Sequence, residues 1–187
     1  MNRPVAWDTL NAAQKAFQAA KMEVHAAMVE RMDLEIGRIV AQLEKGGMLD
    51  NTLVLFLSDN GASAEIMVRG DGHKPEAPAG SAETFLCLGP GWSTACNAPM
   101  RRHKTWNHEG GIATPLVAHW PAGIAKERQG KVDPSLGHVV DLLPTALELA
   151  GLPVVAGPGA PELPGKSLLA VLKGQATRTD GVIWFKH

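Results

Sequence analysis

The pattern of apolar and polar positions divides the chain into one long amphipathic segment followed by several short apolar runs. Residues 11–45 contain no proline and are rich in alanine, glutamine, lysine, glutamate and methionine, which favour a helix. Apolar residues recur there at spacings of three and four, as they do along one face of a helix. The pattern predicts a long helix with one buried stripe, ended by Gly46 and Gly47.

The most informative short run is at residues 53–57, followed by Ser58, Asp59, Asn60 and Gly61. An unbroken run of large apolar side chains closed by turn-forming residues predicts a strand buried on both faces. A helix that leads into such a strand through a short loop is half of a β/α unit with a parallel sheet. The polar pair would then lie at the carboxyl end of the strand, where ligands bind in open α/β sheets.

Two interpretations of the pair Asp59 and Asn60 remain open from these residues alone. Carboxylate and amide oxygens are hard donors suited to Ca²⁺ or Mg²⁺, and Gly61 allows the backbone to bend sharply after them. Asn-Gly between apolar runs is also a strong hairpin sequence, and a plain turn is the alternative. Residues 62–65 do not alternate as a second strand would, which weakens the hairpin interpretation.

The segment at residues 62–113 is rich in glycine and proline and is predicted to be long and irregular, as functional loops often are. Phe85, Trp92 and Trp106 indicate that it is packed rather than disordered. Beyond it, the sequence predicts a strand at 115–120, a helix at 139–150 that Pro144 kinks or makes start late, a short helix at 167–173, and a strand at 182–185.

Composition gives no indication of a nucleic-acid or membrane partner. The chain has 187 residues, enough for one domain or a large piece of one, with 45% hydrophobic and 20% charged residues, as in ordinary globular proteins. Its net charge of −1 provides no bulk attraction to nucleic acid or to acidic membranes. No apolar run approaches the length of a membrane span, and two cysteines are too few for a disulfide framework.

A second informative stretch lies at residues 97–115, where basic and imidazole side chains precede Glu109 and two glycines. A cluster of cations near a divalent metal would suit an anionic substrate. The alternative is a solvated basic surface or a phosphate-binding patch, with the histidines as ordinary hydrogen-bonded loop residues. The side chains of the cluster are Arg101, Arg102, His103, Lys104 and His108.

Taken together, these segments resemble the sulfatase family of the alkaline-phosphatase-like superfamily. The resemblance implies an α/β fold, an alkaline-phosphatase-like three-layer αβα sandwich that is incomplete in this chain. Residues 1–187 would form the middle-to-late portion of a sulfatase catalytic domain. The matching segments are 26–39 (AAMVERMDLEIGRI), 51–64 (NTLVLFLSDNGASA), 100–115 (MRRHKTWNHEGGIATP) with the following LVAHWP, and 137–151 (GHVVDLLPTALELAG).

The resemblance implies hydrolysis of a sulfate ester and assigns roles to particular residues. Asp59 and Asn60 would bind a divalent cation, usually calcium, with magnesium as the alternative. Lys104, five residues before the glutamate of E-G-G, would bind the sulfate of the substrate. Arg102, His103 and His108 are weaker candidates for lining the pocket. The expected substrate is a small-molecule sulfate ester or a sulfated glycan, and the parent family implies a periplasmic or extracellular location.

The sequence departs from the family pattern at two places. Ala113 stands where many relatives have arginine, which leaves substrate preference open. The family nucleophile, a formylglycine made from the first residue of a C/S-x-P-x-R motif, has no counterpart, because the spacing after Cys87 and after Cys96 does not fit. The chain is therefore expected to lack the amino-terminal formylglycine region and the carboxyl-terminal subdomain, and to be nearly inactive alone.

Two other functions remain compatible with the sequence. A phosphodiesterase or phosphonate hydrolase of the same superfamily would use the same kind of metal and cation site. A non-catalytic binding domain would need neither, since the Asp-Asn pair would then be a turn and the basic loop a docking surface.

Overall fold

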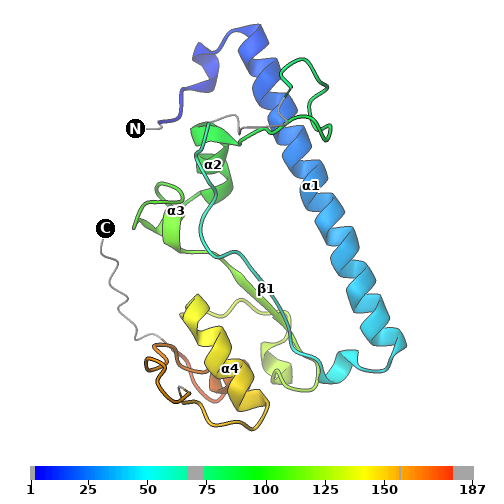
Figure 1. Cartoon of the computed structure of the whole chain (residues 1–187), viewed down its shortest axis with the longest axis vertical. Coiled ribbons are helices and arrows are strands. Elements are labelled where there is room, and N and C mark those ends of the chain that lie inside the picture. The colour runs from blue at the N-terminus through cyan, green and yellow to red at the C-terminus, as the bar shows by residue number, and fades with distance from the viewer. Residues whose placement is uncertain (1–2, 67–73, 156, 179–187) are drawn as a thin grey trace. The chain divides into compact units, whose positions relative to one another are not determined.

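The computed structural model describes residues 3–66, 74–155 and 157–178. Helices and strands follow the order α1, β1, α2, α3, β2, α4, α5 (Figure 1). The chain forms two compact units, which we call the first unit (Met1–Gln42 with Leu57–Pro115) and the second unit (Leu43–Phe56 with Leu116–His187). The strand predicted at 182–185 lies outside the described residues. Short 3-10 helices occur at Trp7–Thr9, Leu49–Asn51, Lys126–Arg128 and Val139–Asp141.

The long predicted helix is confirmed as α1, Ala12–Lys45. Its start is fixed by a reciprocal pair of hydrogen bonds, in which Gln14 N donates to Asn11 Oδ1 (2.9 Å) and Asn11 N donates to Gln14 Oε1 (3.0 Å). This arrangement satisfies backbone donors that have no partner within a helix. At the other end Gly47 has φ +65°, and Met48 N donates to Leu43 O (2.9 Å), as in a Schellman motif.

The predicted burial of the apolar stripe on α1 is wrong for this chain. Lys21 is the buried residue of the helix, whereas the Met28 side chain is 65% exposed. In the first unit, α1 contacts α2 (Gly89–Asn97) through a hydrogen bond from Trp92 Nε1 to Gln18 O (2.8 Å). Such contacts near the amino-terminal half of the helix leave most of its apolar positions uncovered.

Helix α2 corrects the prediction that residues 62–113 are wholly irregular. The sequence Gly89-Pro90-Gly91 resembles a turn, but Gly89 adopts φ +75° and Pro90 lies in the first turn of the helix. Proline is well suited to that position, because its missing N–H would have no partner there. A second short helix, α3 (Glu109–Ile112), follows the basic residues.

The two predicted strands are confirmed as β1 (Val54–Leu57) and β2 (Leu116–His119). Among the described residues they pair with each other in a two-stranded sheet. The predicted burial of β1 on both faces is wrong, because Phe56 is 44% exposed. In β2, Val117 is 56% exposed. The described residues therefore mix helix and sheet, but this sheet is too small to be the middle layer of a three-layer sandwich.

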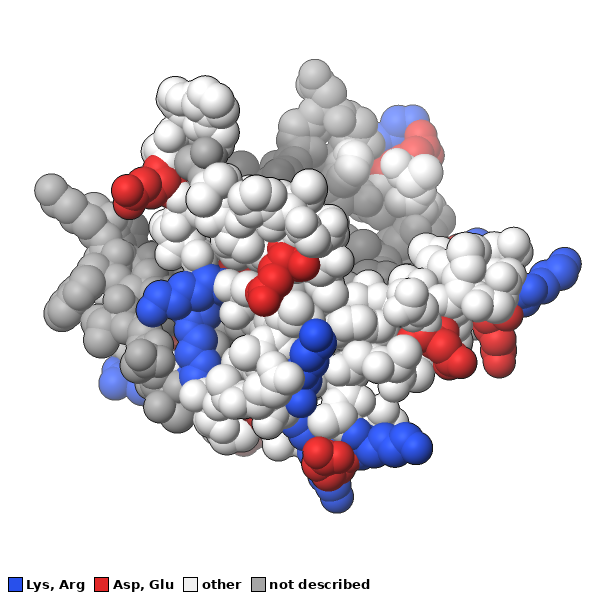
Figure 2. All heavy atoms as spheres, turned by 90° about the horizontal axis from the view of Figure 1, so that it is seen from below, with Lys and Arg blue, Asp and Glu red and all other residues white. Residues whose placement is uncertain are grey.

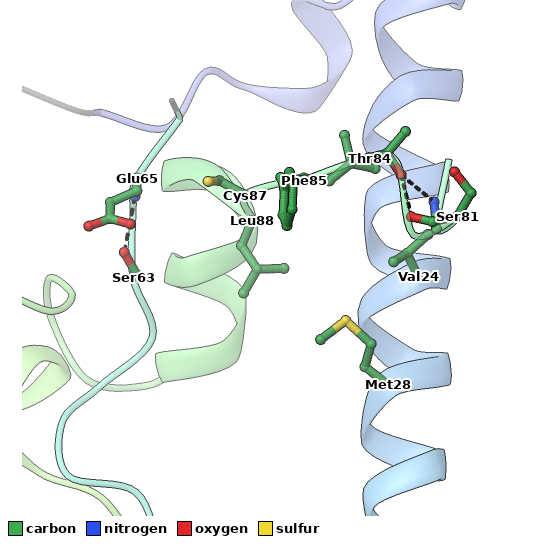
Figure 3. Close-up of a pocket in the computed structure, with 11 residues that line it drawn as sticks. Val24, Met28, Ser63, Glu65, Ser81, Thr84, Phe85, Cys87 and Leu88 are labelled. Carbon is green, nitrogen blue, oxygen red and sulfur yellow. Dashed lines mark hydrogen bonds between the residues drawn. The ribbon is translucent and has the colours of Figure 1, made fainter. Parts of the chain in front are cut away.

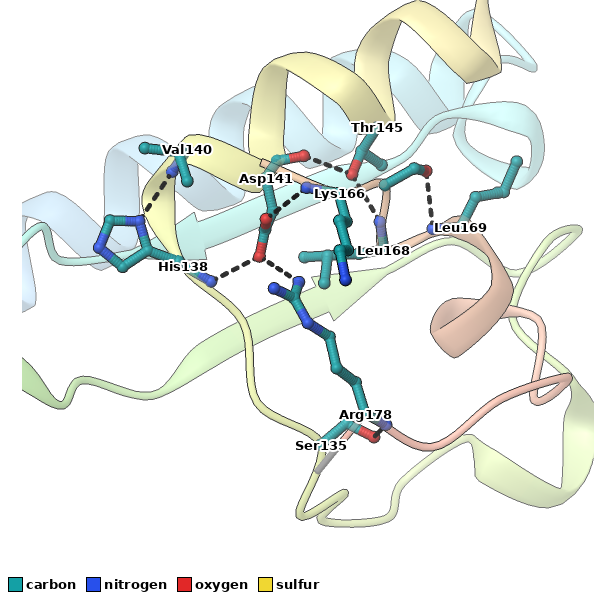
Figure 4. Close-up of polar contacts among 10 residues, drawn as sticks. Ser135, His138, Val140, Asp141, Thr145, Lys166, Leu168, Leu169 and Arg178 are labelled. Carbon is teal, nitrogen blue, oxygen red and sulfur yellow. Dashed lines mark hydrogen bonds and ion pairs between the residues drawn. The ribbon is translucent and has the colours of Figure 1, made fainter. Parts of the chain in front are cut away.

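In the second unit, α4 (Leu142–Leu149) follows directly on a 3-10 turn, so Pro144 marks a late helix start. The carboxylate of Asp141, which is 0% exposed, accepts hydrogen bonds from His138 N (2.8 Å), Lys166 N (2.8 Å) and Arg178 Nη1 (2.5 Å) (Figure 4). Thr145 Oγ1 donates to Asp141 O (2.7 Å). This set of contacts, which we call the Asp141 cluster, holds α4 against the segment that leads into α5 (Leu169–Leu172).

Charged side chains of both signs are interspersed on the face of the molecule shown in Figure 2, in keeping with the net charge of −1. Within the described ranges, no helix is both long enough and apolar enough to cross a membrane.

Candidate functional site

The turn after β1 lies directly against the basic loop in the first unit. We call residues 58–62 the DNG turn and residues 100–111 the basic loop. Gly61 N donates to Gly111 O (3.0 Å), and Lys104 N donates to Ala62 O (3.1 Å). The backbone that carries Asp59 and Asn60 is thus bonded to the backbone that carries Lys104, although these residues are far apart in the sequence.

The side chain of Asn97 at the end of α2 connects the two segments. Its Oδ1 accepts a hydrogen bond from Ala62 N (2.9 Å), and its Nδ2 donates to Arg102 O (3.2 Å). One amide group therefore fixes both the DNG turn and the basic loop. Sequence reasoning missed Asn97, because the segment around it was predicted to be irregular and an asparagine near a proline suggests only a turn.

Three glycines allow the two segments to approach so closely. A Cβ atom on Gly61 would lie 1.9 Å from Gly110 O, one on Gly110 would lie 2.2 Å from Arg102 O, and one on Gly111 would lie 2.0 Å from Trp106 O. Real Cβ contacts are essentially never shorter than 3.0 Å. None of the three glycines has a positive φ. The D-N-G and E-G-G sequences therefore need glycine for space, and the predicted role of Gly61 in bending the backbone is secondary.

Hydrogen bonds at the end of β1 position the predicted metal ligands. Thr114 Oγ1 donates to Ser58 O (2.7 Å), and Ser58 Oγ donates to Asn60 O (3.0 Å). The Asp59 side chain is exposed, and that of Asn60 is half-buried. Their oxygens match in kind what calcium and magnesium prefer. Across the described ranges, no group of three or more His, Cys, Asp or Glu side chains is arranged to hold a metal. The side-chain oxygen donors of this turn that suit such a metal are those of Asp59 and Asn60.

The ammonium group of Lys104 is exposed. Among the described ion pairs none involves Lys104. Its backbone is held by the hydrogen bond from Lys104 N to Ala62 O, while the residue is exposed to solvent. An exposed cation with a held backbone and no carboxylate partner is available to bind an anion.

His103 differs from the other members of the predicted cation cluster because its imidazole is only 6% exposed. Burial, and secondarily the positive charge of Arg102, lowers the pKa of His103. The neutral imidazole of His103 is therefore favoured, so His103 adds little to the positive charge of the loop. The Nδ1 atoms of His103 and His108 are both buried without a hydrogen-bond partner in the part of the chain that the structure describes.

Arg102 adopts φ +69°, which is unusual for a residue with a side chain. Its guanidinium carbon lies 4.6 Å from the centroid of the Trp106 ring, within the range of a cation–π contact. Trp106 in turn meets the His108 ring edge-on, with centroids 5.9 Å apart. Arg102 and His108 thus both contact Trp106 within the basic loop.

The pocket shown in Figure 3 is separate from these residues. It has a volume of about 480 Å³ and lies between α1 and the segment that leads into α2. Val24 and Met28 line it from α1, and Cys87 lines it from the other side. None of the predicted site residues contributes to it. Cys87 and Cys96 both carry thiols and are not joined to each other.

The family model described as Sulfatase matches residues 4–152, which is most of the chain. The chain belongs to the sulfatase family. This sulfatase chain is 38% identical over 157 residues to an uncharacterized sulfatase of Schizosaccharomyces pombe, covering 79% of this chain and 28% of that protein. It is 36% identical over 157 residues to the arylsulfatase of Klebsiella aerogenes, covering 78% of this chain and 33% of that protein.

A solved structure also resembles the sulfatase chain. The crystal structure of Ps i-CgsB in complex with k-i-k-neocarrahexaose has a TM-score of 0.52 and 25% sequence identity, and the similarity covers 90% of this chain and 29% of that chain. The sulfatase chain thus spans a third or less of the length of these proteins. Family membership implies the alkaline-phosphatase-like α/β fold that the sequence resemblance predicted.

Proposed function

We propose that this chain supplies part of the active site of a sulfuric ester hydrolase, which converts R–O–SO₃⁻ and water into R–OH, sulfate and a proton. The main support is the hydrogen bond from Lys104 N to Ala62 O. It joins the DNG turn to the basic loop, and these are the two segments to which the family resemblance assigns metal and sulfate binding. The proposed fold of the whole catalytic domain is the three-layer αβα sandwich of the family.

Asp59 and Asn60 would hold a calcium ion, with magnesium as the alternative. Both side chains offer hard oxygen donors, and calcium takes six to eight such ligands in all. When bound, the metal would polarise a sulfate oxygen and offset its negative charge. The other ligands would come from water or from further protein oxygens.

Lys104 would bind the sulfate of the substrate. Its ammonium is a compact charge with three hydrogen-bond donors, so it can contact a sulfate oxygen and stabilise negative charge on the leaving oxygen as the S–O bond breaks. Arg102, His103 and His108 would line the same pocket. His103 would act as a neutral hydrogen-bonding group there, because burial lowers its pKa.

The nucleophile that the family resemblance implies, a formylglycine, would come from a C/S-x-P-x-R motif. No such motif occurs in the 187 residues. We therefore expect this chain by itself to bind a sulfate ester and to turn it over slowly or not at all. A small-molecule sulfate ester or a sulfated glycan is the proposed substrate, and a periplasmic or extracellular location is proposed from the family.

The proposal is tested by calorimetric binding of 4-nitrophenyl sulfate to the full chain with and without Ca²⁺. We expect binding to depend on Ca²⁺ and to be lost in Asp59→Ala. Lys104→Gln should weaken binding about tenfold or more, since a hydrogen bond to a charged group contributes roughly 1.5–3 kcal/mol. The matched control is Lys45→Gln, which changes an exposed lysine at the end of α1 and should leave binding unchanged.

The proposal would be contradicted if the affinity for 4-nitrophenyl sulfate were the same with and without Ca²⁺ and were unchanged in both Asp59→Ala and Lys104→Gln. Rapid turnover by the isolated chain, abolished by Asp59→Ala, would contradict the expectation that it holds only part of the site. Tighter binding and hydrolysis of 4-nitrophenyl phosphate under the same conditions would favour a phosphoesterase instead.

A further inference from the structure

Arg102 is held in one conformation by contacts on three sides. Its φ of +69° is strained for a residue with a Cβ atom. Asn97 Nδ2 donates to its carbonyl oxygen (3.2 Å). The backbone of Gly110 lies so close to the same oxygen that only glycine fits. The guanidinium rests on the Trp106 ring at 4.6 Å. A strained residue fixed in this way is typical of a ligand-binding position.

The guanidinium of Arg102 has no carboxylate partner among the described residues. An arginine whose face lies on an aromatic ring keeps N–H groups along its edge, and these can bind a planar or tetrahedral anion through two hydrogen bonds. Arg102 is therefore a rigid cation with unused donors. It is also half-buried, so its charge is screened less by solvent than a fully exposed one.

Arg102 and Lys104 form two separate cationic points. Only His103 lies between them in the sequence, and its neutral form is favoured by burial. The Arg102 side chain is fixed on Trp106, whereas the Lys104 side chain is exposed. Thr105, the residue after Lys104, also has a positive φ, +79°, so unusual backbone conformations occur at Arg102 and directly after Lys104. An exposed lysine two residues from an arginine that lies on an aromatic ring suits a ligand with two negative groups.

We propose that Arg102 binds a second anionic group of the substrate beside the ester sulfate at Lys104, so that the site prefers disulfated to monosulfated sugars. This inference rests on the proposed function, since Lys104 is taken as the group that binds the ester sulfate. Arg102 is then a specificity-determining residue, because its guanidinium lies on the Trp106 ring and keeps its edge N–H groups for a second sulfate or a carboxylate.

The test compares monosulfated and disulfated forms of one neutral disaccharide, titrated calorimetrically into the full chain at a fixed salt concentration. The wild-type chain should bind the disulfated form about tenfold or more tightly than the monosulfated form, as expected for one added charge-assisted contact. Arg102→Gln should weaken binding of the disulfated form much more than that of the monosulfated form, and so reduce the preference to about twofold or less.

Arg102→Gly removes the guanidinium without adding backbone strain, because glycine accepts a positive φ. It therefore separates the effect of the lost side chain on binding from any effect on the backbone. We expect Arg102→Gly to fold at least as stably as the wild type and still to lose the preference. A wild-type chain without a preference, or a preference retained in both the Gln and Gly variants, would overturn the inference.

Lys104→Gln distinguishes this inference from the proposed function. This variant should weaken binding of the monosulfated and the disulfated disaccharide by a similar factor, so that the preference for the disulfated form remains. If Lys104→Gln changed neither affinity while Arg102→Gln abolished the preference, the role of Lys104 would be wrong and the second anion site at Arg102 would stand.

Discussion

At the scale of single residues, the candidate site depends on glycines, which have no Cβ atom, as well as on its polar side chains. Gly61, Gly110 and Gly111 leave the space in which two backbone segments meet. The Asn97 amide then bonds to both segments. The chemistry proposed for Asp59 and Lys104 needs this close contact, because side chains can share a ligand only if their backbones are held near each other.

The requirement for glycine predicts a large effect of one methyl group. Gly61→Ala should lower the free energy of unfolding of the first unit by about 2 kcal/mol or more, since the added Cβ would overlap the backbone of Gly110. Gly37→Ala is the matched control, because Gly37 is exposed within α1 and nothing lies within 4 Å of its added Cβ. It should raise the free energy of unfolding by roughly 0.5–1 kcal/mol.

Urea unfolding followed by circular dichroism measures both glycine variants. Equal stability of Gly61→Ala and the wild type would mean that the DNG turn and the basic loop are not in contact as described.

At the scale of elements, the sequence pattern was sufficient where local physical chemistry decides the structure. The long helix α1 and the strands β1 and β2 follow from spacing, apolar runs and terminating glycines. Helix α2 did not follow, because its Gly-Pro-Gly start is also a common turn sequence and a packing contact through Trp92 supports it. Burial was mispredicted for β1 and α1, because burial depends on neighbouring elements that a local pattern does not contain.

The site could be predicted only in part for the same reason. The residue types at 59, 60 and 104 suggested metal and anion binding, and the family resemblance linked them. The contact between their segments depends on Asn97 and on the spacing of glycine backbones, which involve residues distant in sequence. Similarly, the burial of His103 could not be predicted from its place among basic neighbours.

The Asp141 cluster gives an element-scale prediction for the second unit. Asp141→Asn replaces one acceptor by an amide N–H that would face the N–H donors of the cluster (Figure 4). Because Asp141 is fully buried and ion-paired with Arg178, we expect the free energy of unfolding to fall by about 3 kcal/mol. Glu148→Gln, an acid-to-amide change at an exposed position of α4, should change it by less than about 0.5 kcal/mol.

Amide hydrogen exchange provides the measurement for these two variants. Asp141→Asn should speed exchange at Lys166 N, which donates to the Asp141 carboxylate, and at Leu168 N, which donates to Thr145 Oγ1. Unchanged exchange at both amides would mean that the cluster does not hold α4 against this segment.

At the scale of the whole molecule, the chain is a sulfatase-family polypeptide that spans a third or less of the relatives and the solved structure compared with it. Within its first unit, the DNG turn and the basic loop are already joined by backbone hydrogen bonds. The two segments proposed to bind the metal and the sulfate are therefore already in contact within this chain. Several large apolar residues of α1 and of the two-stranded sheet are exposed in this chain.

A metal held at Asp59 and Asn60 would lie next to the Lys104 backbone, because Lys104 N donates to Ala62 O. Mn²⁺, which accepts oxygen ligands as calcium and magnesium do, can be titrated into ¹⁵N-labelled chain while amide signals are followed by NMR. We expect the amide signals of Asp59, Asn60, Gly61 and Lys104 to broaden first, and Asp59→Ala to abolish the effect. Broadening at these amides no greater than in α4, or broadening unchanged by Asp59→Ala, would contradict this expectation.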